Sequence, residues 1–134
     1  MTEQTNTQPP LSSQRDATRL KLARVASLTA AVAIMAGAFG AHGVSGEPKR
    51  WLMTGGHYQL MHAIAALVAL RWSERLTSSA LLLTGAWIFA GSLYAMALGA
   101  PRALGAITPI GGLIMIIAWV TLAFTLRLRS SVEG

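Results

Sequence analysis

The sequence predicts an all-α integral membrane protein built as a four-helix bundle. The first observation is that four stretches carry no formal charge, residues 25–46, 51–70, 76–101 and 103–126. A helix rises about 1.5 Å per residue and needs about 20 residues to cross a hydrocarbon core of about 30 Å. The second is the composition, with 53% hydrophobic against 12% charged residues. In a chain of 134 residues, four spans leave room for one membrane domain and none for a soluble catalytic domain.

The distribution of basic residues predicts the orientation. Eight of them flank the ends of the spans on one side, against Lys49, Arg50 and Arg102 on the other. The eight are Arg15, Arg19, Lys21, Arg24, Arg71, Arg75, Arg127 and Arg129. Positively charged flanks remain inside, so we expect both termini in the cytoplasm and the protein in the bacterial inner (plasma) membrane. Anionic headgroups of the lipid bilayer are the expected partners of this charge. Nucleic acid is not, because no aromatic residues interleave the N-terminal basic residues.

The expected transmembrane domain is residues 20–128, with spans at about 20–41, 57–70, 78–98 and 108–126. Residues 1–19 should form a disordered cytoplasmic tail, because Thr, Gln, Ser and Pro dominate their beginning. Residues 129–134 should form a second tail. The first span has a rival interpretation as a signal peptide cleaved near Ala36-Gly37-Ala38. The polar leader and the continuation of the apolar run through Phe39 favour a retained helix.

The second helix has the weakest boundaries. Pro48 suits the first turn of a short interfacial segment between the first two helices, with Trp51 at headgroup level. Gly55-Gly56 is expected to interrupt this segment, which leaves a span of about 21 Å. Either the helix begins nearer Leu52 and tolerates the glycines, or Arg71 snorkels and the bilayer thins.

The fourth helix has a similar choice at Pro109. Either Thr108 caps the helix and Pro109 takes its first position, or the helix is discontinuous.

Small residues recur at helical spacing and predict close packing between helices, because packing drives association in lipid. We expect this role for Ala33, Gly37, Gly40, Gly85, Gly91, Gly99, Pro109, Gly111 and Gly112. Trp87 and Tyr94 cannot both lie in the interfacial belts, so at least one of them should leave the belts for the bundle or mid-lipid.

Polar side chains within the spans mark the candidate site, because unpaired polar groups are costly in lipid. We expect a cluster near the external face, between the first, second and fourth helices. Its candidate members are His42, His57, Tyr58, Gln59, His62, Ser92, Tyr94 and Thr108. His62 either ties helices together through a backbone carbonyl or Ser92, or binds a ligand or a proton. No metal or cofactor is expected: His57 and His62 lie about 140° apart around the helix, and the chain has no cysteine.

Four segments resemble the signature segments of domain-of-unknown-function family 423. They are Gly37–Gly43, Tyr58-Gln59 with His62-Ala63, Gly91–Tyr94 and Ile107–Gly112, and the resemblance covers about residues 20–126. The resemblance implies a small multi-pass membrane protein without an assigned biochemical activity. It therefore supports the fold and supplies no reaction.

Two functions are compatible with these observations. Motifs of nucleophilic, phosphate-binding or zinc-protease enzymes are absent, so an enzyme is not expected. The first hypothesis is a non-enzymatic interaction or accessory/assembly factor, with a membrane-protein partner or a homo-oligomer. The second is a carrier or channel for a small neutral or weakly charged molecule that uses the His/Tyr/Gln cluster.

Overall fold

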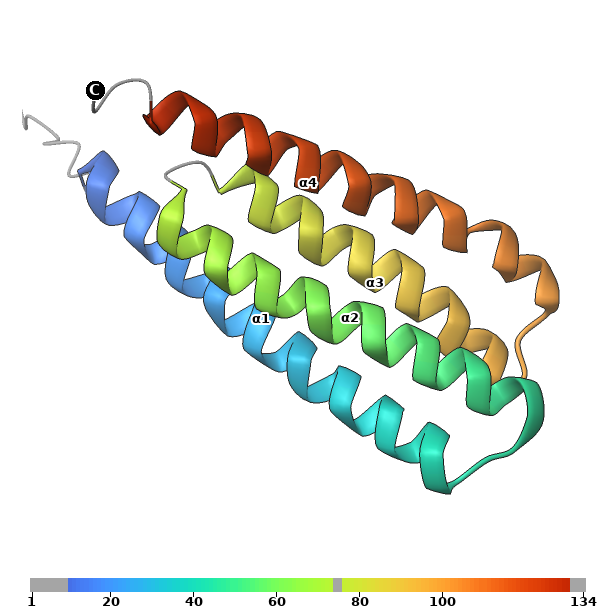
Figure 1. Cartoon of the computed structure of the whole chain (residues 1–134). Helices are drawn as coiled ribbons and strands as arrows, with labels where there is room; N and C mark the ends of the chain where they lie inside the picture. The colour runs from blue at the N-terminus through green and yellow to red at the C-terminus, as the bar shows by residue number, and fades with distance from the viewer. Residues whose placement is uncertain (1–9, 74–75, 131–134) are drawn as a thin grey trace, which may run out of the picture.

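The residues that the structure describes fold into four antiparallel α-helices (Figure 1). The computed structural model describes residues 10–73 and 76–130. Its elements are α1 (Leu11–His42), α2 (Gly46–Trp72), α3 (Thr77–Ala97), the short 3-10 helix η1 (Arg102–Ala106) and α4 (Thr108–Ser130). The beginning of α1 and the end of α4 lie at the same end of the molecule (Figure 1). We call this the basic end, because Arg15, Arg19 and Arg71 lie there.

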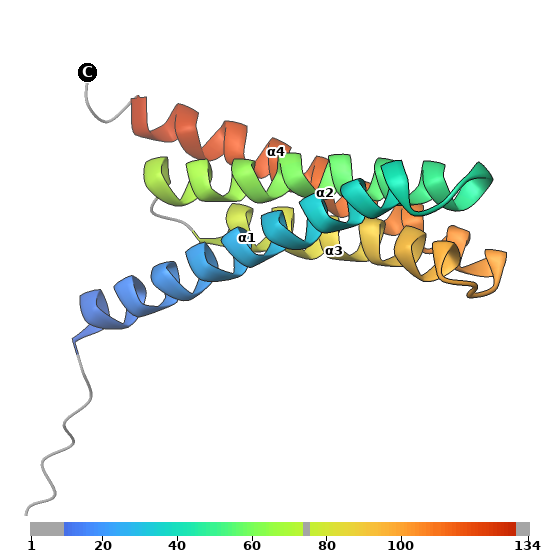
Figure 2. The same ribbon diagram turned by 90° about the horizontal axis from the view of Figure 1, so that it is seen from below.

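The helices pack in chain order, so the bundle is open. Each helix packs mainly against its neighbours in sequence, and α2 and α3 occupy the middle (Figures 1 and 2). Within the described residues α1 and α4 do not pack against each other. Short connections make this up-and-down order the simplest arrangement. Each outer helix therefore turns most of its surface away from the protein.

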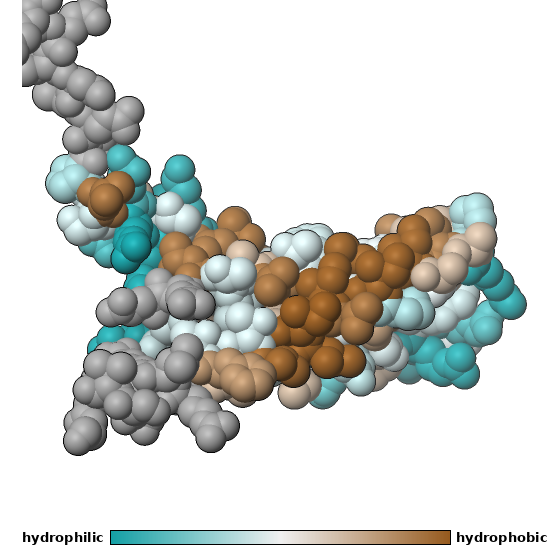
Figure 3. Space-filling view, turned by 90° about the horizontal axis from the view of Figure 1, so that it is seen from above, coloured by the Kyte–Doolittle hydropathy of each residue, from teal (hydrophilic) through white to brown (hydrophobic). Residues whose placement is uncertain are grey.

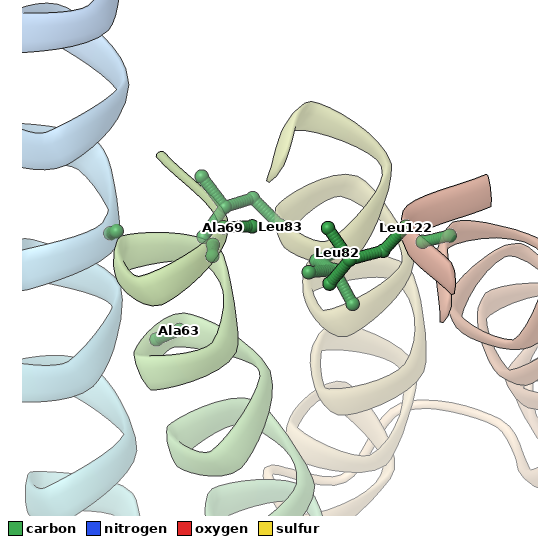
Figure 4. Close-up of a cluster of buried hydrophobic side chains, with 8 residues drawn as sticks. Ala63, Ala69, Leu82, Leu83 and Leu122 are labelled. Carbon is green, nitrogen blue, oxygen red and sulfur yellow. The ribbon is translucent and has the colours of Figure 1, made fainter. Parts of the chain in front are cut away.

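Alanine dominates the buried core, which brings the helix backbones close together. The core cluster takes residues from all four helices: Ala26, Ala63, Ala66, Ala69, Leu82, Leu83, Ala118 and Leu122 (Figure 4). Leu82 of α3 is fully buried at its centre. Small side chains suit helices that associate in lipid, where contact between backbones replaces the hydrophobic effect as the driving force.

The outer surface is apolar in the middle and polar at both ends. Figure 3 shows an apolar band across one face, with hydrophilic residues beyond it on either side. On α4 the exposed side chains include Ile110, Leu113, Ile116, Val120 and Phe124. A band of this kind would drive aggregation in water and is stable against hydrocarbon chains. The structure thus confirms the predicted all-α membrane fold.

Three segments of the described chain are long and apolar enough to cross a membrane: α1, α3, and Arg102–Thr125 of η1 and α4. The helix α2 is not among them, although its 27 residues extend about 40 Å. His57, Gln59 and His62 lower its hydropathy. The helix that carries four of the eight candidate polar residues is thus the one without a stretch as apolar as those of the other three.

The predicted disordered tail is wrong for residues 11–19, which form the first turns of α1. Pro10 precedes the helix, and the residues after it include the helix-forming Leu11, Gln14 and Arg15. The Thr18 hydroxyl also donates a hydrogen bond to the Gln14 carbonyl at 3.0 Å. Residues 1–9 of that tail and residues 131–134 of the other lie outside the described residues. Residues 129–130 belong to α4.

The predicted interfacial segment is also wrong, because α2 is continuous from Gly46. Gly46 makes the turn from α1 with a φ of +69°, which favours glycine. Pro48 then lies in the first turn of the helix, as its missing N–H allows. Gly55 and Gly56 lie inside the helix, where packing partners use the space they leave. The helix therefore tolerates its glycines, as one alternative has it, but begins at Gly46 and not near Leu52.

Helix α4 begins at Thr108 and runs unbroken to Ser130, so the discontinuous-helix alternative is wrong. The Ile107 carbonyl accepts hydrogen bonds from the N–H groups of Ile110 at 3.0 Å and Gly111 at 3.5 Å. Ile107 thus takes the capping position that was predicted for Thr108. Pro109 lies in the first turn and is exposed. The connection before it contains η1.

Candidate functional site

The first polar contact of the candidate site joins α2 to α3. The Tyr94 hydroxyl donates a hydrogen bond to Gln59 Oε1 at 2.8 Å. Gln59 is fully buried, and its Nε2 has no hydrogen-bond partner among the described residues. Gly55 makes room for the tyrosine ring, since a Cβ at this position would lie 2.7 Å from Tyr94 Cε1. Tyr94, one of the two aromatic residues that could not both lie in the interfacial belts, therefore enters the bundle and reaches α2.

The second contact joins α3 to the start of α4. Ser92 Oγ and Thr108 Oγ1 are 2.7 Å apart. Ser92 Oγ also donates a hydrogen bond to the Phe89 carbonyl at 2.9 Å. A hydroxyl has one hydrogen to donate, so Thr108 is the donor to Ser92. The Thr108 hydroxyl therefore joins two helices, in place of the predicted cap on its own helix.

His62 of α2 bonds at both ring nitrogens. Its Nδ1 lies 2.7 Å from the Tyr58 carbonyl, and its Nε2 accepts a hydrogen bond from Trp119 Nε1 at 3.3 Å. A carbonyl only accepts and an indole N–H only donates, so the contacts define a neutral ring protonated at Nδ1. The carbonyl partner belongs to the same helix as His62, so the bond that joins helices comes from Trp119, in place of the interhelical carbonyl or Ser92 that was predicted. Both nitrogens are used within the bundle.

Aromatic rings surround this histidine. The Tyr58 ring stacks on His62 at 6.3 Å between centroids and packs against Phe89 of α3 at 4.9 Å. His57 touches the Tyr58 ring edge-on and is itself exposed. His42 is exposed at the end of α1.

The structure brings six of the eight predicted residues into contacts between helices, and the helices that they join differ from those predicted. The paired members of the cluster are Tyr58, Gln59, His62, Ser92, Tyr94 and Thr108, which lie between α2, α3 and α4 rather than between the first, second and fourth helices. His42 and His57 contribute exposed rings at its margin. No group of three or more metal-binding side chains occurs in the part of the chain that the structure describes.

Two tryptophans make interhelical bonds that the sequence did not assign. Trp119 Nε1 bonds to His62, and Trp87 Nε1 donates to Thr29 Oγ1 of α1 at 2.9 Å. The position of Trp119 could have predicted its bond, because a tryptophan near the middle of an apolar stretch lies away from both interfaces and its N–H needs a partner.

The predicted packing residues divide into close contacts and open positions. Gly85 and Gly111 face each other across α3 and α4, since a Cβ on Gly111 would lie 2.7 Å from the Gly85 carbonyl oxygen. Gly40 faces Leu52, and the Ala33–Gly37 segment faces Gly56. In contrast, a Cβ on Gly91 or Gly99 would meet no atom within 4 Å, and one on Gly112 only Phe89 at 4.0 Å. Gly99 instead follows α3 with a φ of +101°.

These features define a class, a small polytopic α-helical membrane protein whose polar side chains connect its helices. The family described as "Protein of unknown function (DUF423)" matches residues 36–112, which is more than half of the chain. The chain belongs to this family. The matched segment contains all eight candidate polar residues, whereas Trp119 lies beyond it.

Relatives from several bacteria are similar over most of their length. A UPF0382 membrane protein of Haemophilus influenzae is 40% identical over 114 residues, which cover 78% of this chain and 91% of the relative. YwdK of Bacillus subtilis, a UPF0382 membrane protein, is 35% identical over 105 residues, 70% of this chain and 85% of the relative. The inner membrane protein YgdD of Escherichia coli is 33% identical over 115 residues, which cover 78% of this chain and 88% of the relative. None of the solved structures matches this chain.

The names of these relatives agree with the predicted location. All three are membrane proteins, and the one from Escherichia coli is an inner membrane protein. Together with the apolar helices of the structure, they confirm the inner-membrane location that the sequence predicts. None of these names states a reaction.

Proposed function

We propose that the protein acts by interaction, as a non-enzymatic accessory or assembly factor of the inner membrane. The observation that supports this most is the pairing of its intramembrane polar groups. His62, Ser92, Thr108 and Tyr94 each bond to a group on a neighbouring helix. Polar groups used in this way stabilise the bundle and are not available to a passing solute.

The carrier or channel hypothesis needs the opposite arrangement. A permeation path requires polar groups that line water and exchange partners as the solute moves. The described parts of the membrane helices also carry no acidic side chain deep in a span that could couple transport to protons. The pairing of Tyr94 with Gln59, and of His62 with Trp119, therefore favours a role through contact with other molecules.

His62→Ala separates the two hypotheses. Under the proposed function, this change should lower the free energy of unfolding by about 1 kcal/mol, the range for interhelical hydrogen bonds in membranes. Thermal denaturation of the purified protein in detergent measures this effect. His57→Ala is the matched control on the same helix, and we expect no change because its ring is exposed.

Proteoliposomes provide the second measurement. Wild-type protein should leave the permeability to glycerol, urea and methylammonium equal to that of protein-free vesicles. Flux above that level in the wild type that disappears in His62→Ala, and persists in His57→Ala, would refute the proposed role and support a carrier.

A further inference from the structure

A polar cavity lies at the basic end, between the beginning of α1 and the end of α2. Its volume is about 580 Å³, and its lining includes Arg15 and Arg19 of α1 and Arg71 and Trp72 of α2. Among the described side chains that line it, Asp16 is the acidic one. The three guanidinium groups and one carboxylate of these described side chains leave a net charge of +2. The cavity therefore favours an anion.

The arginines that line this cavity are suited to binding a phosphate group. A guanidinium presents parallel N–H donors that match the oxygens of phosphate, and it remains charged under all cellular conditions. Arg19 is already held across the gap, since its Nη2 donates to the Ser73 carbonyl at 3.3 Å. Basic pockets between helices at the cytoplasmic surface are suited to phosphate-bearing headgroups. The sequence predicts that this end is cytoplasmic.

A second cavity of about 580 Å³ begins at the same tryptophan. It is a groove between α2 and α4, and its lining includes Met61, Ala65, Val68 and Trp72 of α2 and Trp119 of α4. From Met61 to Trp72 the helix rises about 16 Å, close to half of a hydrocarbon core of about 30 Å. The groove thus extends through one leaflet and reaches the level of the His62–Trp119 pair. Trp72 lines both cavities.

We propose that one anionic phospholipid of this leaflet occupies the two cavities together. Its phosphate lies among Arg15, Arg19 and Arg71, and one acyl chain lies in the groove between α2 and α4. The pairing of a cationic and an apolar cavity at Trp72 matches a molecule with a charged head and a hydrocarbon chain. Free phosphate would satisfy only the first cavity. This proposal does not depend on the proposed function, since a carrier could hold the same lipid.

Native mass spectrometry of the full chain tests the proposal. Delipidated protein is mixed with equal amounts of phosphatidylglycerol and phosphatidylcholine that carry identical acyl chains. We expect one bound phosphatidylglycerol, preferred about tenfold or more over phosphatidylcholine. Millimolar inorganic phosphate should not displace it. Equal binding of the two lipids would overturn the proposal, and so would displacement by phosphate, which would indicate a site for the free anion.

One variant with a matched control tests each of the two cavities. Arg15→Gln with Arg71→Gln should weaken phosphatidylglycerol binding about thirtyfold, whereas Lys21→Gln with Arg24→Gln removes the same charge from α1 outside the cavity lining and should have little effect. Ala65→Phe fills the groove and should weaken binding about tenfold. Leu113→Phe, on the exposed face of α4, is its control. Variants that bind the lipid like their controls, while keeping the wild-type helix content, would overturn the corresponding half of the site.

Discussion

Replacing Gly111 with alanine should separate α3 from α4 and lower the free energy of unfolding by about 3 kcal/mol. The added Cβ would lie 2.7 Å from the Gly85 carbonyl oxygen. This neighbour is backbone, which cannot rotate away as a side chain can. The two helices must therefore move apart, and the Ser92–Thr108 bond near the same interface lengthens with them. Reversible unfolding in mixed micelles measures the change.

Gly112→Ala is the matched control for this change. It has the same chemistry one residue further along α4, but the nearest atom to its Cβ is Phe89 Cδ2 at 4.0 Å. A helical glycine replaced with alanine without a clash should stabilise the helix by about 0.5–1 kcal/mol. Equal effects of the two substitutions would contradict the contact between Gly85 and Gly111.

The second large effect is expected at the crossing of α1 and α2. In Gly56→Ala, the new Cβ would lie 2.8 Å from the Ala33 carbonyl oxygen and 3.2 Å from the Gly37 amide nitrogen. Both neighbours belong to the backbone of α1, so we expect a loss of about 2–3 kcal/mol, measured by the same unfolding assay.

The control for this crossing lies on the opposing helix. A Cβ on Gly37 would meet no atom within 4 Å, although its backbone forms part of the contact. Gly37→Ala should therefore leave stability unchanged or raise it by about 0.5–1 kcal/mol. If Gly56→Ala lowers the free energy of unfolding and Gly37→Ala does not, the Cβ position of Gly56 faces the backbone of α1, and that of Gly37 faces open space. Destabilisation by Gly37→Ala with no effect of Gly56→Ala would show that α1 is rotated from the position described.

The sequence predicted the membrane fold because hydrocarbon imposes long uncharged segments, and these are visible without any tertiary information. It did not predict the course of α2. Gly55-Gly56 and Pro48 are local signals for a break, yet Tyr94 and Ala33 occupy the space that these glycines leave. Contacts from two neighbouring helices thus outweigh a local preference of about 1 kcal/mol per glycine.

The candidate site was also predicted only in part from the sequence. Polar residues in apolar stretches must find partners, which identified His62, Gln59 and Tyr94 as residues of interest. Which groups pair depends on the rotation of each helix about its axis, and no pattern within one helix contains that information. This is why Trp119 was missed and why the cluster was placed against α1 instead of α3. It is also why Gly91 was assigned to a packing face, although a Cβ at this position would meet no atom within 4 Å.

Whether the intramembrane polar groups are paired within a dry bundle can be measured directly with two thiols. The chain has no cysteine, so Ser92→Cys with Thr108→Cys introduces a single pair without background. Because the two hydroxyl oxygens are 2.7 Å apart, the thiols should form an intramolecular disulfide on mild oxidation in native membranes and resist a membrane-impermeant maleimide. Two thiols that fail to cross-link and react readily with the maleimide would show a water-filled path between α3 and α4, and would contradict the structural role proposed for these residues.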